Sequence, residues 1–481
     1  MATETIEATD HRLLVDGERL ETGEWSEVKS PYDGSLIGRV PKADASVVER
    51  AVKSATAAFE TGGFPQHARA EVLDRAAHLV REREDELAAT IAAEAGKPLK
   101  TALVEAQRCV GTLTFSAVEA RVLTGEMVPM EGGPAGEGKL GFVIRVPYGV
   151  VGAISPFNFP LNLVAHKLGP AIAAGNAVVL KPAGQTPISA IKLAEILYEA
   201  GLPERWLQVV CGSGSEVGNA IVESDGIGAI TFTGSAGVGW EIRAKAARKK
   251  VNLELGSTAP LIVHEDGNWE KAADAAKIHA FSHAGQSCIS VQRILLHESI
   301  AEEFTERFVG NVESLVVGDP MDPDTDVGPS ISEDDRDRVK RWVDEAAGAG
   351  GEVLTGGELV DEGRCLAPTV LREPPRDEKV WCEEIFGPVA TVHAFKGFDE
   401  AIALANDARY GLQAGIFTRD LGLAIEAGKR LEFGGVLVNE VPTFRTDQMP
   451  YGGVKDSGNT REGPAYAVRE LTEERLVTLQ G

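Results

Sequence analysis

Cys288 lies among small and polar neighbours in the stretch HAGQSCIS. A thiolate in such surroundings can attack a reactive carbon. The chain has five cysteines at wide spacing and no CxxC pair, which argues against a disulfide framework and a structural zinc site. We therefore expect no metal and one reactive thiol. A buried, inert thiol is the alternative, and it suits the other four cysteines, Cys109, Cys211, Cys365 and Cys382.

Two further stretches place a polar side chain at the end of an apolar run. Glu254 interrupts the run in LELGSTAP, where loss of solvent should raise its pKa towards that of a general base. A structural carboxylate bonded to a backbone amide is the alternative. Asn158 lies between two aromatics in ISPFNFPLNLVAHK. Its amide could donate to an oxyanion, although asparagine is also a common turn residue.

Two stretches could hold a nucleotide. In ITFTGSAGVG a strand leads into glycines and then a helix, a turn that lets the backbone approach a pyrophosphate. A tight turn that binds nothing explains the same pattern. In VVLKPAGQTP, Lys181 ends a buried strand and could reach a ribose or a phosphate, or could simply extend into solvent. EEIFGPV, with Glu384 and Phe386 before a Gly-Pro turn, carries little information alone.

The elements that must position these residues alternate between strand and helix. Between 150 and 262, short apolar runs such as GVVGAIS and NAVVLKP alternate with helical stretches. This order predicts an α/β fold with an open parallel sheet, helices on both faces and ligands at the carboxyl ends of the strands. A second α/β pattern covers about 265–465.

The flanking segments predict helices and an arm. A helix is expected over 43–62, with Ser46 and Glu49 forming a capping box, and longer helices over about 67–95 and 101–124. GGPAGEGKLGFVIRVPYGV predicts a Gly-rich loop and a strand. The tail VRELTEERLVTLQG ends in a β-like run, of a kind that often packs on a neighbouring subunit.

Composition excludes some classes of partner. The chain has 481 residues, enough for two or three domains, and a net charge of -25, which disfavours nucleic acid and anionic membranes. No apolar run is long enough to span a bilayer. MATETIEATDHRLLVDGERL lacks the apolar region of a signal peptide, so a cytoplasmic location is expected. The acidic surface fits either a high-salt environment or an ordinary acidic enzyme.

Together, these stretches resemble the aldehyde dehydrogenase superfamily. ISPFNFP, VVLKPA, FTGS, LELG, GQSC, EEIFGPV and MPYGGVKDSG occur in the family's order, and the separation of Glu254 from Cys288 is similar to the family's. The resemblance implies a Rossmann-like cofactor domain, an α/β catalytic domain and a β oligomerisation arm in a homodimer or homotetramer. The expected ranges are 1–123 with 146–256 for the cofactor domain and 257–465 for the catalytic domain. The oligomerisation arm is expected to consist of 124–145 with 466–481.

The resemblance also implies a reaction. Cys288 would attack an aldehyde to give a thiohemiacetal. The Asn158 amide and the Cys288 backbone N–H would hold the oxyanion. Hydride would pass to the nicotinamide of NAD or NADP, and Glu254 would activate the water that hydrolyses the thioester.

The resemblance also implies which residues of this chain contact the cofactor, because the family's cofactor-binding motifs can be matched to it. Lys181 resembles the adenosine-ribose contact, and Glu384 resembles the nicotinamide-ribose contact beside Phe386. Many NAD-preferring members carry a glutamate where this chain has Gly184. Without that carboxylate a 2′-phosphate is not repelled, so we expect NADP to be accepted, alongside NAD. The full expected set is Ser155, Pro156, Phe157, Lys181, Gly184, Gly214, Gly218, Phe232, Thr233, Gly234, Ser235, Val238, Leu255, Glu384 and Phe386.

The expected substrate pocket is polar. Relatives specialised for apolar aldehydes place aromatic and thioether side chains where this chain has Asn162, His166 and Arg445; Ser287 adjoins the nucleophile. Arg445 could pair with a carboxylate, phosphonate or sulfonate. We expect a small hydroxylated or anionic aldehyde of the lactaldehyde, glycolaldehyde, glyceraldehyde or semialdehyde type. GQSCISVQR and MPYGGVKDSGNTREGP look most like lactaldehyde dehydrogenases and related enzymes for phosphono- or sulfo-aldehydes. Structural hydrogen bonds by His166 and Arg445 are the alternative.

Three other functions compete. A CoA-acylating semialdehyde dehydrogenase usually lacks the glutamate of LELG, which this chain retains as Glu254. A non-catalytic structural relative tends to lose the nucleophile or the base. A thiol hydrolase that pairs Cys288 with His283 would not explain the FTGS and VVLKP motifs.

Overall fold

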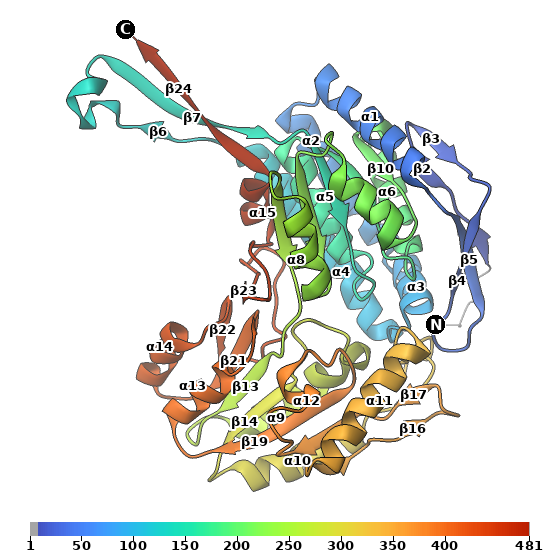
Figure 1. The fold of residues 1–481 in the computed structure, drawn as a ribbon, viewed down its shortest axis with the longest axis vertical. Helices are drawn as coiled ribbons and strands as arrows, with labels where there is room; N and C mark the ends of the chain where they lie inside the picture. The colour runs from blue at the N-terminus through green and yellow to red at the C-terminus, as the bar shows by residue number, and fades with distance from the viewer. Residues whose placement is uncertain (1–7, 481) are drawn as a thin grey trace.

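Two α/β bodies and a projecting β arm make up the molecule in this computed structural model, which describes residues 8–480 (Figure 1). Each body is built on a seven-stranded sheet. The predicted α/β class and its three parts are therefore confirmed as architecture, while the domain limits stay a prediction. The first seven residues of the N-terminal stretch and Gly481 lie outside the described residues.

The first sheet has the strand order β12-β11-β8-β9-β10-β2-β3. Five strands are parallel, and β2 and β3 add an antiparallel edge. These parallel strands are the apolar runs of the sequence, buried along nearly their whole length. Their bounds are β2 Leu13–Val15, β3 Glu18–Leu20, β8 Val150–Ile154, β9 Ala177–Lys181, β10 Leu207–Val209, β11 Ala229–Thr233 and β12 Lys250–Glu254.

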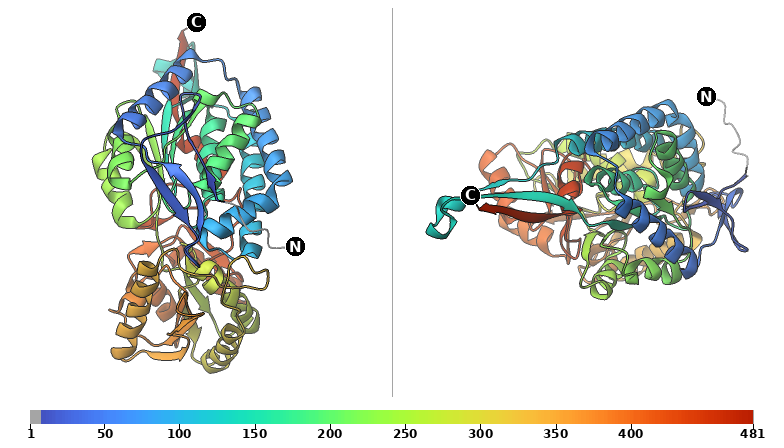
Figure 2. Two further views of the ribbon diagram at one scale, coloured as in Figure 1. Left: turned by 90° about the vertical axis from the view of Figure 1, so that its right-hand side faces the viewer. Right: turned by 90° about the horizontal axis from the view of Figure 1, so that it is seen from above.

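Helices cover both faces of this sheet (Figure 2). One face carries α1, α7 and α8, and the other carries α5 and α6 with α2, α3 and α4 packed outside them. The bounds are α1 Ala45–Thr61, α2 Gln66–Glu82, α3 Glu84–Ala95, α4 Leu99–Val122, α5 Asn162–Ala174, α6 Ile188–Glu199, α7 Asn219–Glu223 and α8 Ala236–Lys245.

Two helix predictions were wrong in detail. The residue that caps α1 is Asp44, whose carboxylate accepts the Val47 N–H at 3.0 Å. Ser46 already lies inside the helix and donates to the same carboxylate, so the Ser46–Glu49 capping box does not form. The predicted helix 67–95 is two helices that meet at Arg83. Three acidic residues in the first turn of α3 favour a new helix start there.

The second sheet has the order β15-β18-β19-β14-β13-β21-β22, parallel except for β15. Its strands are β13 Pro260–Val263, β14 Arg293–His297, β15 Glu352–Thr355, β18 Thr369–Arg372, β19 Val389–Phe395, β21 Gln413–Phe417 and β22 Gly435–Val438. Its helices are α9 Trp269–Phe281, α10 Ala301–Glu313, α11 Glu333–Gly348, α12 Lys379–Cys382, α13 Phe398–Asn406 and α14 Leu421–Arg430.

Smaller elements complete the fold. Two-stranded pairs join β16 Leu359–Val360 to β17 Cys365–Leu366 and β20 Tyr410–Gly411 to β23 Val454–Lys455. A three-stranded sheet near the N-terminus contains β1 Thr9–Asp10, β4 Trp25–Lys29 and β5 Leu36–Pro41. No helix among residues 8–480 is long and apolar enough to cross a membrane.

The arm consists of β6 Met127–Val128, β7 Lys139–Pro147 and the C-terminal strand β24 Thr472–Gln480, which follows α15 Pro464–Glu470. β7 and β24 pair antiparallel and extend well beyond the first body (Figure 1). Several apolar side chains of the pair are half or more exposed, namely Leu140, Leu476 and Leu479.

The chain crosses between the two bodies twice near one point. The short segment 255–259 connects β12 to β13, and the segment 440–463 returns along the same place. Leu255 N donates to Ser457 O at 3.0 Å, and Glu254 bridges Gly458. The carboxyl ends of β8, β9, β11 and β12 therefore face the second body, where a parallel sheet is expected to bind its ligands.

Candidate active site

One cavity of about 380 Å³ lies between the bodies and brings the three predicted catalytic residues together. Asn158, Glu254 and Cys288 all line it. They come from the loop after β8, the end of β12 and the loop before β14, so three segments far apart in sequence meet at one place. The sequence predicted the residues separately, and the fold supplies their proximity.

A left-handed turn presents Cys288. His283, Ala284 and Gly285 have φ values of 52°, 53° and 68°, a region that costs free energy for residues other than glycine. Gln286 fixes the end of the turn, because its side-chain amide donates to the His283 carbonyl at 3.1 Å and accepts the Ile331 N–H at 2.8 Å. The surrounding structure thus holds the nucleophile loop in a conformation that it would not adopt alone.

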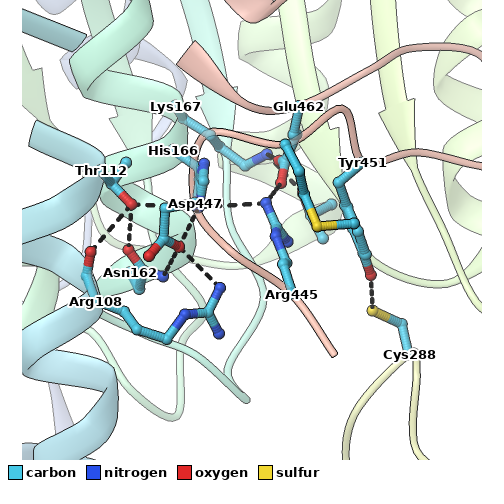
Figure 3. Close-up of polar contacts among 12 residues, drawn as sticks. Arg108, Thr112, Asn162, His166, Lys167, Cys288, Arg445, Asp447, Tyr451 and Glu462 are labelled. Carbon is cyan, nitrogen blue, oxygen red and sulfur yellow. Dashed lines mark hydrogen bonds and ion pairs between the residues drawn. The ribbon is translucent and has the colours of Figure 1, made fainter. Parts of the chain in front are cut away.

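The thiol of Cys288 has a phenol as its partner. Its Sγ lies 2.8 Å from the Tyr451 hydroxyl (Figure 3). Burial raises the pKa of Cys288 to about 12, and the hydrogen bond from Tyr451 acts in the opposite direction. In this state the thiol is protonated at neutral pH, so its activation requires a further group that favours the thiolate.

Glu254 is a buried carboxyl group without a hydrogen-bond partner. Only 3% of the residue is exposed, and neither carboxylate oxygen has a partner among the described residues. Burial, and then the negative charge of Glu462, raise its pKa well above the usual range. The pKa of Glu254 is therefore raised, as the sequence predicted. The alternative, a carboxylate hydrogen-bonded to a backbone amide, does not occur among the described residues.

Asn158 is held against the nucleophile loop. Its Nδ2 donates to the Gln286 carbonyl at 2.9 Å, which leaves its second N–H for another acceptor. The loop that carries it is anchored by Glu105, whose Oε1 accepts the backbone N–H groups of Leu161 and Asn162 at 2.9 and 3.0 Å.

Lys97 completes the anchor of the Asn158 loop. It pairs with Glu105 and lies 3.6 Å from the centre of the Phe159 ring. Sequence reasoning missed both charged residues. Their only sequence signal was a lysine and a glutamate in an alanine-rich stretch, AAEAGKPLKTALVEAQ.

The expected cofactor residues line two cavities. Eight line the cavity that contains Cys288, namely Pro156, Phe157, Thr233, Gly234, Ser235, Leu255, Glu384 and Phe386. Five line a cavity of about 360 Å³ beside the first sheet, namely Lys181, Gly214, Gly218, Phe232 and Val238. Gly184 lines neither, but it borders a hollow of about 630 Å³ that also contains Lys42 and Ser213. Ser155 lines none of these, and its hydroxyl is buried without a partner among residues 8–480.

These surroundings fit a dinucleotide. Gly234 and Ser235 lie directly before α8, whose N-terminus favours a phosphate charge. Gly239 lies so close to the Leu255 side chain that a Cβ would collide with it, so glycine there lets α8 approach the end of β12. Glu384 accepts the Ser257 N–H at 3.0 Å, and burial raises its pKa to about 7.

Three of the four expected substrate residues, Asn162, His166 and Arg445, lie in a largely buried polar cluster, which also contains Arg108, Thr112, Lys167, Asp447 and Glu462 (Figure 3). Asp447 Oδ1 is the shared acceptor of one half. It lies 2.8 Å from Arg108 Nη2 and 3.2 Å from both Asn162 Nδ2 and His166 Nε2. Burial, and then Arg445, lower the pKa of His166, so the imidazole is neutral in this cluster.

Glu462 organises the other half of the polar cluster. Its Oε2 lies 2.9 Å from Arg445 Nη2, and its Oε1 lies 3.7 Å from Lys167 Nζ. Arg445 also lies 3.2 Å from His166 Nε2 and stacks 3.8 Å from the centre of the Tyr451 ring. Ser287, the fourth expected substrate residue, accepts the Ser290 N–H through its backbone and does not line the Cys288 cavity.

Three cations therefore face two carboxylates. Among residues 8–480, the ion pairs of Arg108, Lys167 and Arg445 within this cluster are made with Asp447 and Glu462. In addition, the Nε atoms of Arg108 and Arg445 are buried without a partner in the part of the chain that the structure describes. Sequence reasoning missed Arg108, Asp447, Tyr451 and Glu462 as a group. Arg108 comes from α4 and has no motif, while the others lie in or near the quoted MPYGG motif without an assigned role.

Comparison with known proteins gives the class. Residues 19–477 match the aldehyde dehydrogenase family. The chain is 45% identical over 477 residues to 3-sulfolactaldehyde dehydrogenase of Priestia aryabhattai, covering 99% of both chains. Among solved structures it is similar to aldehyde dehydrogenase 21 of Physcomitrella patens in complex with the reaction product succinate, with 36% identity, a TM-score of 0.95 and 99% coverage of both chains. It is also similar to glyceraldehyde-3-phosphate dehydrogenase GapN of Methanocaldococcus jannaschii complexed with NADP, with 38% identity, a TM-score of 0.91 and coverage of 96% and 100%.

The chain belongs to the aldehyde dehydrogenase family. It is an NAD(P)-dependent aldehyde dehydrogenase, as its motifs predicted. The α/β fold with a Rossmann-like part, a catalytic part and an arm is likewise confirmed by these structural neighbours.

Proposed function

We propose that the protein oxidises a small aldehyde with a polar or anionic tail to the carboxylate, through a thioester on Cys288. The observation that carries this proposal is the single cavity lined by Cys288, Glu254 and Asn158, which adjoins the cationic cluster through Tyr451. The first set supplies a nucleophile, a base and an oxyanion donor. The cationic cluster supplies positive charge that can bind the polar or anionic tail of the aldehyde.

The reaction begins at the thiolate of Cys288, which attacks the aldehyde carbon and forms a C–S bond. The resulting oxyanion of the thiohemiacetal accepts the free Nδ2–H of Asn158 and the backbone N–H of Cys288; one such donor is worth about 10²–10³ in rate. A nicotinamide cofactor held beside Glu384 and Phe386 would supply the hydride acceptor, and loss of the hydride from the thiohemiacetal carbon leaves a thioester on Cys288. Glu254 then takes a proton from water, the hydroxide attacks the thioester, and the C–S bond breaks to give the carboxylic acid and the Cys288 thiolate, with the proton on Glu254.

The substrate tail fits an anion or a hydroxyl group best. The cluster has one more cation than carboxylate, and two unpaired guanidinium N–H donors are buried in it. Guanidinium groups bind carboxylate, sulfonate and phosphate oxygens well. The relative named for 3-sulfolactaldehyde and the neighbour in complex with succinate support an anionic tail. We place semialdehydes and sulfo- or phospho-aldehydes first, and lactaldehyde, glycolaldehyde and glyceraldehyde next.

Both NAD and NADP fit the adenosine side. A Cβ at Gly184 would meet nothing within 4 Å, and the adjoining hollow is lined by Lys42 together with three acidic residues, Glu24, Asp44 and Glu216. A 2′-phosphate can therefore enter without direct repulsion from that position. The neighbour complexed with NADP supports this proposal.

Two rival mechanisms are less well supported. A CoA-acylating enzyme has no need of a base for water, whereas Glu254 lines the Cys288 cavity with both carboxylate oxygens unpartnered in the described residues. A thiol hydrolase using His283 would need that imidazole beside the sulfur. The hydrogen-bond partner of Cys288 Sγ is Tyr451, and His283 is buried in the left-handed turn.

The proposal also covers the oligomeric state, the domain limits and the cellular location of the protein. We propose a homodimer or homotetramer joined through 124–145 and 466–481, supported by the exposed apolar side chains of the arm. The cofactor domain of 1–123 with 146–256, the catalytic domain of 257–465 and a cytoplasmic location belong to the same proposal. The partner it needs is a small aldehyde, not nucleic acid or membrane.

The test follows NAD(P)H formation with a panel of neutral and anionic aldehydes, each with NAD and NADP and with and without CoA. Cys288→Ser serves as the blank. We expect turnover without CoA, with anionic aldehydes giving the highest kcat/KM. A rate that requires CoA, or a preference for apolar aldehydes, would contradict the proposal.

A further inference from the structure

Tyr451 provides the hydrogen bond to the sulfur of Cys288. The two atoms are 2.8 Å apart, and Sγ has no other hydrogen-bond partner among residues 8–480. Tyr451 is 3% exposed and packs against Ile289 and Leu412. The phenol is therefore a buried group held by packing, and it forms part of the protein wall next to the thiol.

The position of Tyr451 is fixed by its backbone and by its ring. Its backbone exchanges two hydrogen bonds with Glu462, of 3.1 and 2.6 Å. Arg445 lies over the face of its ring at 3.8 Å, and Glu462 holds Arg445 there through a 2.9 Å ion pair. A cation over the ring face draws electron density from the phenol. The hydroxyl should consequently be a better hydrogen-bond donor than that of an isolated tyrosine.

The donor can be assigned by chemistry. A thiolate has no proton and can only accept, so in the reactive form of Cys288 the Tyr451 hydroxyl must be the donor. Hydrogen bonds to ionised groups are the strong ones. After attack on the aldehyde the sulfur carries no charge and is a weaker acceptor. The contact therefore favours the thiolate over the thiol and is weakened once the C–S bond has formed.

We propose that Tyr451 is a positioning residue for Cys288: its hydroxyl donates to the thiolate, keeps the sulfur turned into the cavity and increases the fraction of nucleophile before attack, with Arg445 and Glu462 holding the phenol in place. This inference rests on the proposed function only in taking Cys288 as the nucleophile. Its main test is independent of aldehyde oxidation.

The test compares Tyr451→Phe with the wild type by alkylation of Cys288 with iodoacetamide over a range of pH, read as labelled Cys288 peptide by mass spectrometry. Phenylalanine keeps the ring under Arg445 and removes only the hydroxyl. A hydrogen bond to a charged group corresponds to about ten- to hundredfold in the thiolate fraction, so the alkylation midpoint should rise by about one to two pH units. The pH profile of kcat/KM should shift in the same direction, with recovery at high pH.

Tyr198→Phe is the matched control. Tyr198 lies on α6, and its hydroxyl donates to the Leu207 carbonyl at 2.6 Å. Its loss removes one tyrosine hydrogen bond without touching the thiol, so the alkylation midpoint should stay at the wild-type value. An unchanged midpoint in Tyr451→Phe, or an equal shift in both variants, would overturn the inference.

A second measurement needs no tyrosine variant. The S–H stretching band of Cys288, assigned by its absence in Cys288→Ser, should lie near the frequency of a free thiol in the wild type, because the sulfur accepts from Tyr451 and its own proton has no acceptor. A band at the lower frequency of a donating thiol would mean that Cys288 donates to the phenol, and would contradict the donor assignment. If alkylation shifts but no aldehyde is oxidised, the proposed function fails and the inference stands. If aldehydes are oxidised and the alkylation midpoint does not shift, only the inference fails.

Discussion

In the Cys288 cavity Glu254 keeps both carboxylate oxygens without a partner in the described residues, whereas in the polar cluster beyond Tyr451 the Asp447 carboxylate lies within hydrogen-bond distance of three side chains. The two acids also differ in pKa. Burial raises the pKa of Glu254, while His166 and Arg108 outweigh burial and lower that of Asp447. An unpaired buried acid is available to a reacting water. A fully paired acid fixes its neighbours.

The difference shows how one site can combine reactivity with selectivity. An unsatisfied buried polar group reduces stability, and such groups are tolerated where they serve chemistry. In the proposed function, the polar cluster instead holds its cations at fixed positions before the substrate binds, so that little ordering of side chains is needed on binding. Four variants or conditions test this contrast, from the largest expected effect to the smallest.

Glu254→Gln should have the largest effect. The amide cannot take a proton from water, so hydrolysis of the thioester should slow by about 10²–10⁴, while attack by Cys288 continues. Rapid-mixing assays should show one burst of NAD(P)H, and mass spectrometry should show the acyl group on Cys288. Steady turnover close to that of the wild type would mean that another group activates the water.

Arg445→Leu should change selectivity rather than chemistry. Loss of a charged hydrogen bond to the tail should lower kcat/KM for anionic aldehydes by about 10–100-fold, with a smaller loss for neutral ones. The ratio of the two substrates within one variant cancels differences in folded fraction. Arg461→Leu, in the same segment but bonded to backbone carbonyls, should leave that ratio unchanged. A preserved ratio in Arg445→Leu would favour a purely structural role.

Asp447→Asn and Glu254→Gln should affect stability in opposite ways. The first removes the charge that balances Arg108, and should lower the free energy of unfolding by about 1–3 kcal/mol. The second removes an unpaired buried acid and should leave stability equal or higher. Urea unfolding of both variants at neutral pH measures the two values. Equal destabilisation would show that the contrast between the regions is wrong.

The pH dependence should give the smallest effect. Burial raises the folded pKa of Glu254 well above the usual value of 4.5 for a glutamate, so its contribution to stability is complete below pH 4.5 and is lost as pH rises through the folded pKa. Hydrolysis should change in the opposite direction and quicken with pH, because only the carboxylate is a base. Deacylation rates in single-turnover assays check this. A rate that falls with rising pH would contradict the assignment.

Residues at strand ends were the part of the site that the sequence could predict. Glu254 and Lys181 each close an apolar run, and parallel strands bring such ends to one edge. The break at Arg83 and the cap at Asp44 depend on choices among neighbouring residues that hydrophobic periodicity does not resolve.

The polar cluster could not be predicted in the same way. Arg108 lies on α4, whose pattern is an ordinary amphipathic one, and it meets Asp447 only because α4 packs on α5 beneath the returning segment 440–463. Ion pairs of this kind depend on tertiary packing and have no local signal. Arg445 was singled out for its charge, but its pairing with Glu462 and its stacking on Tyr451 required the fold.

The returning segment places Arg445, Asp447, Tyr451 and Glu462 within eighteen consecutive residues. Its second half is held by the Tyr451–Glu462 bridge and by the bond from Leu255 to Ser457. The proposed tail recognition and the thiol contact therefore share one short stretch of the sequence. A single recombination event, or one synthetic exchange of 445–462 between relatives, would transfer Arg445 and both carboxylates of the cluster at once. Arg108, Thr112, Asn162, His166 and Lys167 would still need to match the incoming segment.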